Sequence, residues 1–194
     1  MAVQNTTPVK GTWSLPKLDV SQFVVLALLV GLDIVLGKLT VGTNVLKISF
    51  VFVAMSLIAK WYGPVWTMMI ATILDVVGAT IINPSGTFFL GFTLSAITAG
   101  LIYALFYYNQ VHVSWLRILG AVGLVTFVVN AGMNTLWLFI MYSQVHTWDS
   151  FVTLLIPRLI KSIMMYPIQV IVTYAFLNNA AVKQATKKFL ISNA

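Results

Sequence analysis

Six long apolar segments constrain what this chain of 194 residues folds into. They cover about 21–37, 46–60, 64–82, 87–108, 115–142 and 152–178. A helix that crosses the hydrocarbon core of a bilayer needs about 20 residues, with a usual range of about 17–25. Since backbone polar groups in lipid must bond to one another, such segments fold as helices. The pattern predicts an all-α integral membrane protein with six transmembrane helices in one bundle.

The composition agrees with a membrane protein and excludes several other classes. Hydrophobic residues make up 60% of the chain and charged residues only 8%, whereas a soluble domain has about 25% charged residues. The chain has no cysteine and no glutamate, and it lacks the GxxxxGK[ST] phosphate loop and the HExxH zinc motif. We therefore expect that the chain is not an enzyme and that it binds neither a cofactor nor a metal. The formal charge of +7 reflects orientation in the membrane rather than binding of nucleic acid.

The basic residues predict the organisation of the chain and its orientation. Residues 1–20 form a polar tail without the apolar core of a signal peptide, residues 21–179 form the transmembrane domain, and residues 180–194 form a basic tail. With a cytoplasmic N-terminus, the tails and inner loops contain Lys10, Lys17, Lys60, Arg117, Lys183, Lys187 and Lys188. The outer loops after the third and fifth helices contain neither Lys nor Arg. The positive-inside rule then places both termini in the cytoplasm.

In this orientation, six charged residues with a net charge of +2 fall in the outer half of the protein. They are Asp33, Asp75, Lys38, Lys47, Arg158 and Lys161. A charge at the centre of a membrane helix costs on the order of 2.5–3.5 kcal/mol, so such residues usually have a function. The two lysines outside the helix over 152–178 also fit snorkelling to the headgroups, and the aspartates also fit structural ion pairs.

The helix over 152–178 carries polar residues on one face. Arg158 shares this face with residues at offsets of 3, 4, 7 and 11, which are Lys161, Ser162, Met165 and Gln169. A face in contact with lipid would not be this polar. We therefore predict that it points into the bundle or into a water-filled cavity, as part of a binding site.

The helix over 115–142 carries a second polar face. Asn130, Asn134, Trp137 and Met141 lie at offsets of 0, 4, 7 and 11. The amides fit two roles. They bridge helices, which is common in membranes, or they read the edge of a flat heteroaromatic ligand while Trp137 stacks on its ring.

Several short stretches of the chain are similar to one known family. They are NTLWL at 134–138, PRLIK at 157–161, MYPI at 165–168, and WYGP at 61–64 followed by Asp75. Together with the six predicted helices, they resemble the membrane-embedded substrate-binding subunits, or S-components, of energy-coupling factor (ECF) vitamin transporters. The folate-specific members are the most similar, and the resemblance covers essentially the whole chain.

The resemblance implies a function and partners. An S-component in the cell membrane captures its vitamin near the outer face and works with a transmembrane T-component and two cytoplasmic ATPase subunits. Its first helix carries a small-residue motif, usually Ala-xxx-Ala, for which this chain has Ala27 and Gly31. Such spacing permits close approach of helices, either within the bundle or in a docking partner.

Folate as ligand would explain the charges in the outer half. Its pterin ring is flat, its benzoate is apolar, and its two carboxylates complement a net charge of +2. We expect the substrate-binding residues to be Arg158, Lys161, Asn134, Trp137, Asp75, Lys38 and Gln169. Within this set, Arg158 makes a bidentate fork, Asn134 and Asp75 read the pterin edge, and Trp137 stacks.

Two alternatives remain open at this stage. Another vitamin, such as thiamin or riboflavin, is one, although cationic thiamin fits a net charge of +2 poorly. A membrane scaffold subunit without a ligand is the other, in which case the polar faces only contact neighbouring helices.

Overall fold

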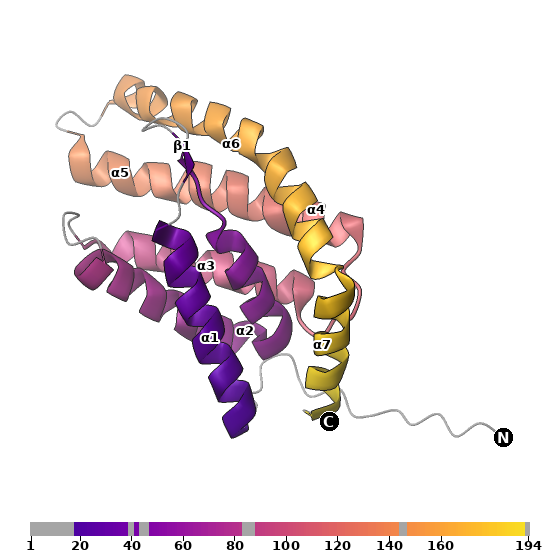
Figure 1. Ribbon diagram of the computed structural model, residues 1–194. Coiled ribbons are helices and arrows are strands. Elements are labelled where there is room, and N and C mark those ends of the chain that lie inside the picture. The colour runs from indigo at the N-terminus through magenta and orange to yellow at the C-terminus, as the bar shows by residue number, and fades with distance from the viewer. Residues whose placement is uncertain (1–17, 39–40, 43–46, 83–87, 144–146, 193–194) are drawn as a thin grey trace.

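The computed structural model describes residues 18–38, 41–42, 47–82, 88–143 and 147–192. Its helices are α1 (Val20–Lys38), α2 (Val51–Val77), α3 (Leu90–Tyr107), α4 (Trp115–Gly123), α5 (Asn134–Tyr142), α6 (Trp148–Leu177) and α7 (Ala180–Ser192). Two π-helical stretches, η1 (Gly78–Ile82) and η2 (Leu124–Met133), continue α2 and join α4 to α5. Strands β1 (Val41–Gly42) and β2 (Lys47–Ile48) pair antiparallel. Figure 1 shows the helices gathered in one bundle.

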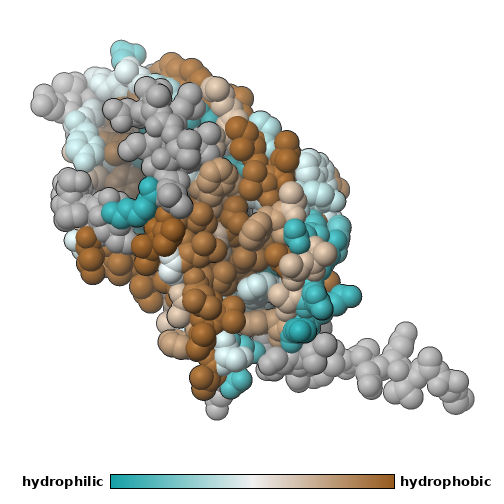
Figure 2. All heavy atoms as spheres, in the orientation of Figure 1, coloured by the Kyte–Doolittle hydropathy of each residue, from teal (hydrophilic) through white to brown (hydrophobic). Residues whose placement is uncertain are grey.

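Five helices of the described chain are long and apolar enough to cross a membrane. They are Val20–Lys38, Val51–Ile81, Leu90–Tyr107, Trp115–Tyr142 and Trp148–Leu177. Many large apolar side chains on them are exposed, including Phe23, Leu28 and Ile163. In Figure 2 hydrophobic residues cover α1 and the centre of the visible face, whereas hydrophilic residues gather toward α7. An apolar outer surface of this extent agrees with the predicted all-α membrane fold.

The structure shortens the start of the predicted helix at 46–60 and joins this helix to the predicted helix at 64–82. Residues 47 and 48 belong to β2, and one helix, α2, covers most of both segments. At Gly63 this helix is interrupted, with φ 78° and ψ 179°. Only glycine adopts this conformation readily, and Pro64 disfavours α-helical geometry in the residue before it. The break therefore divides α2 into two arms.

Contacts with α1 and α3 show how the two arms are placed. The Tyr62 hydroxyl donates to the Gln22 carbonyl at 2.7 Å, so the end of the first arm lies beside the start of α1. In the second arm, Asp75 Oδ2 accepts from the Thr93 hydroxyl at 2.7 Å, near the start of α3. The first arm thus packs antiparallel to α1 and the second antiparallel to α3. Figure 1 shows the chain changing direction within α2.

Lys60 lies fully buried beside this break. Its Nζ donates to the carbonyl oxygens of Leu177 at 2.9 Å and Val111 at 3.3 Å. It therefore satisfies one of the last carbonyls of α6, where a cation also suits the helix dipole. The sequence predicts Lys60 in an inner loop, but the structure places it inside the helix bundle.

The predicted basic tail over 180–194 contains the helix α7. The indole nitrogen of Trp61 donates to the Thr186 hydroxyl at 2.9 Å, and the Trp61 and Phe189 rings stack with centroids 5.8 Å apart. These contacts attach α7 to the break in α2. The predicted boundary of the transmembrane domain near residue 179 stays a prediction, as does the tail over 1–20, most of which lies outside the described residues.

Candidate functional site

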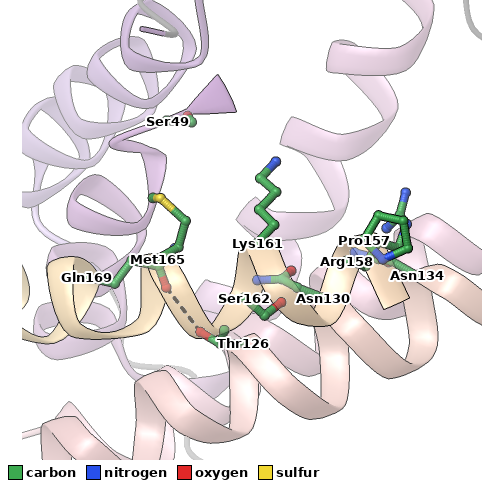
Figure 3. Close-up of a pocket in the computed structure, with 10 residues that line it drawn as sticks. All are labelled: Ser49, Thr126, Asn130, Asn134, Pro157, Arg158, Lys161, Ser162, Met165 and Gln169. Atoms are coloured by element: carbon green, nitrogen blue, oxygen red, sulfur yellow. Dashed lines mark hydrogen bonds between the residues drawn. The ribbon is translucent and has the colours of Figure 1, made fainter. Parts of the chain in front are cut away.

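A polar cavity of about 540 Å³ lies between α6 and the helix formed by η2 and α5. It is lined by Ser49, Thr126, Asn130, Asn134, Pro157, Arg158, Lys161, Ser162, Met165 and Gln169. Figure 3 shows these side chains gathered along the facing sides of the two helices, with Ser49 approaching from the segment before α2. The lining contains two cations and, among the described residues, no acid. The cavity is therefore suited to an anionic ligand.

One wall of this cavity is the polar face predicted for the helix over 152–178. Arg158 and all four residues predicted to share its face line the cavity. The regular spacing of α6, which extends through this whole region, explains why helical periodicity located them together. Both cationic side chains are partly exposed and line the cavity, a placement that spares a charge the cost of hydrocarbon.

The opposite wall comes from η2 and the start of α5. Thr126 and Asn130 lie in the π-helical stretch, and Asn134 directly follows it. Asn134 Oδ1 is buried and has no hydrogen-bond partner in the described chain. A buried amide oxygen without a partner is costly, so Asn134 offers an unused acceptor at the cavity.

A second cavity of about 170 Å³ adjoins the first. It is lined by Asp75, Phe92, Ser95, Ala96, Ala99, Val129, Asn130 and Asn134. Asn130 and Asn134 line both cavities, so these two amides form the boundary between them. Asp75 is thus separated from the main cavity by the asparagines, and its carboxylate contributes acceptors on the α3 side.

Trp137 lies on the α3 side and is not among the described residues that line the main cavity. Its indole nitrogen donates to Ser95 Oγ at 2.9 Å, and its ring packs near Phe89 with centroids 5.9 Å apart. At about 100° per residue, the sequence predicts Trp137 on one face with Asn130 and Asn134. Asn130 and Asn134 also line the second cavity, as does Ser95, so Trp137 lies beside the part of this face that points toward α3.

Lys38 and the small residues of α1 lie elsewhere. Lys38 is exposed in the last turn of α1 and lines neither cavity within the described part of the chain. Ala27 and Gly31 are exposed on one side of α1. A Cβ added at Gly31 would meet nothing within 4 Å. This side of α1 is therefore open to a neighbour outside the bundle.

Three residues of the cavity, Pro157, Thr126 and Ser49, lay outside the two predicted polar faces, and Pro157 directly precedes Arg158. Thr126 lies four residues before Asn130, so extending the polar face of that helix by one turn would have found it. Ser49 lies between β2 and α2. It has no periodic signal because it belongs to a connection.

An apolar helical bundle that encloses a cationic polar cavity defines a membrane-embedded binding protein. Residues 21–177 match the family described as ECF transporter, substrate-specific component. The chain belongs to this family. It is therefore a multi-pass protein of the cell membrane and the substrate-binding component of a transporter, not an enzyme, as the sequence predicted.

Relatives with this fold are named for folate. The chain is 55% identical over 186 residues to the "Folate transporter FolT" of Leuconostoc mesenteroides subsp. mesenteroides, covering 96% of this chain and 98% of the relative. It is 36% identical over 156 residues to the protein of the same name from Clostridium novyi, covering 80% and 87%. A crystal structure of FolT bound with folic acid has a TM-score of 0.69 and 36% identity, covering 81% of this chain and 92% of that chain. These findings confirm the resemblance drawn from the sequence.

Proposed function

We propose that this chain captures folate with high affinity at the outer face and delivers it across the membrane as the S-component of an ATP-driven ECF transporter. One observation carries the proposal. A cavity with two cations and no acid among its described lining residues occurs in a chain that is 55% identical to a folate transporter over 96% of its length.

The two cavities complement the two ends of folate. Arg158 and Lys161 supply donors for the carboxylates of the glutamate tail, and the guanidinium can hold one carboxylate by two parallel bonds. Asp75 and Asn134 supply acceptors for the amino and N–H groups of the pterin edge. The α6 wall from Arg158 to Gln169 spans about 16 Å at about 1.5 Å per residue, which suits an elongated ligand.

The proposed topology has six membrane passes and both termini in the cytoplasm. In it, the two arms of α2 cross the membrane separately and reverse at Gly63. The contacts of the first arm with α1 and of the second with α3 support this arrangement. The open side of α1 with Ala27 and Gly31 then faces lipid, where the T-component docks and couples the chain to the two ATPases.

The alternatives fit the cavity less well. Thiamin is a cation and would meet Arg158 and Lys161 with like charge. Riboflavin has no carboxylate for them. A scaffold subunit has no need for a cavity of about 540 Å³ lined by charged side chains, since such charges are costly in a membrane.

Titration of the purified protein with folate tests the proposal. We expect folate to quench the fluorescence of the six tryptophans with tight, saturable binding, and thiamin and riboflavin to give no response. A response to riboflavin or thiamin alone would reassign the ligand. No response to any of the three would contradict folate capture and favour the scaffold alternative.

A further inference from the structure

A hydrogen bond between Thr126 and Gln169 joins the two walls of the main cavity. Thr126 Oγ1 donates to Gln169 Oε1 at 3.0 Å, from η2 to α6, as Figure 3 shows. Thr126 is only 2% exposed, and both residues line the cavity. The bond therefore holds the Gln169 side chain from a position that water hardly reaches.

This bond determines which part of the Gln169 amide the cavity presents. A side-chain amide carries an acceptor oxygen and a donor NH2 group on opposite sides of one carbon. Since the oxygen is held toward Thr126, the NH2 group points away from η2. Arg158 and Lys161 on the same wall have only donors. Arg158, Lys161 and Gln169 thus present hydrogen-bond donors along the α6 wall.

We propose that Thr126 is a positioning residue for substrate binding, which fixes the Gln169 amide so that its N–H groups face an acceptor of the ligand. The inference rests on the proposed function, because it takes folate as that ligand. Folate offers carboxylate, carbonyl and ring-nitrogen acceptors. A donor fixed before binding loses less conformational entropy than one that must be ordered by the ligand.

A purely structural role predicts a different outcome. If the bond only held η2 against α6, its loss would weaken binding through a general change in packing. T126V and Q169L would each break this same bond, so a structural role also predicts effects that do not multiply, but it requires both variants to lower the midpoint of thermal unfolding without folate. A positioning role instead requires that Thr126 act through the Gln169 amide. Its effect on binding must disappear once that amide is absent.

A double-mutant cycle on folate affinity tests this dependence. We expect T126V to weaken binding about fivefold, since it removes one neutral hydrogen bond that orders a ligand contact. T126S keeps the hydroxyl and should stay within about twofold of the wild type. Q169L should weaken binding about tenfold, and the double variant T126V/Q169L should match Q169L within about twofold.

Thr173 provides a matched control on α6. It is buried, its hydroxyl has no partner in the described chain, and it does not line the cavity. T173V should therefore leave folate affinity unchanged. Wild-type affinity in T126V, effects of T126V and Q169L that multiply in the double variant, or a midpoint of thermal unfolding without folate that both single variants lower by several degrees would overturn the positioning role while leaving folate capture intact. A wild-type protein that does not bind folate would overturn both.

Discussion

Replacing Arg158 by alanine should weaken folate binding at least tenfold. Arg158 lines the main cavity, where its guanidinium can hold a carboxylate by two parallel charge-assisted bonds. Removing one partner of such a pair leaves the carboxylate poorly paired, which costs about 1.5–3 kcal/mol. Tryptophan quenching in a folate titration measures the loss, and size-exclusion chromatography with thermal unfolding checks that the variant is folded.

The chain itself contains the control for this experiment. Its other arginine, Arg117, is exposed on α4 and donates to the Phe106 carbonyl at 3.3 Å, and it lines neither cavity. R117A should bind folate within about twofold of the wild type. R158K keeps the charge but loses the planar fork, so its affinity should fall between the two. A folded R158A protein with wild-type affinity would remove Arg158 from the site.

Helical periodicity could predict the α6 wall because α6 is regular where it carries Arg158 and Gln169. Charged residues in a membrane helix face the interior, and a constant angle per residue then places every polar neighbour. The predicted helix over 115–142 agrees in extent with the chain from Trp115 to Tyr142. Within it, periodicity placed Asn130 and Asn134 at the cavities, but it could not show that Trp137 donates to Ser95 of α3 rather than lining the main cavity.

Tertiary contacts account for the other differences between the predicted and the observed structure. Lys60 belongs by composition to a basic loop, yet the carbonyl of Leu177, distant in sequence, gives it a buried position. The docking of α7 depends on Trp61 and Thr186, which are also far apart in the chain. The turn at Gly63 was visible in the sequence. The sequence did not show that the two arms pack against different helices, because those contacts are long-range.

Replacing Gly63 by alanine should destabilise the protein by about 3 kcal/mol. Gly63 has φ 78° and ψ 179°, a conformation that costs other residues about 1–3 kcal/mol. A Cβ there would lie 2.9 Å from Tyr108 Cε2 and 3.0 Å from its Cζ, and relief of such crowding in a packed core typically costs a further 1–3 kcal/mol or so. The measurement is the midpoint of thermal unfolding in detergent, which should fall by several degrees.

Gly78, which follows α2, separates the strain at Gly63 from the general effect of an added methyl group. Its backbone is helical, with φ −59° and ψ −46°, and an added Cβ would meet nothing within 4 Å. G78A should therefore leave stability unchanged or raise it by about 0.5–1 kcal/mol, as alanine does in a helix. Equal midpoints for G63A and G78A would mean that the chain does not need the glycine-only conformation at Gly63. The reversal of the chain at Gly63, which places Asp75 of the second arm at the second cavity, would then need another cause.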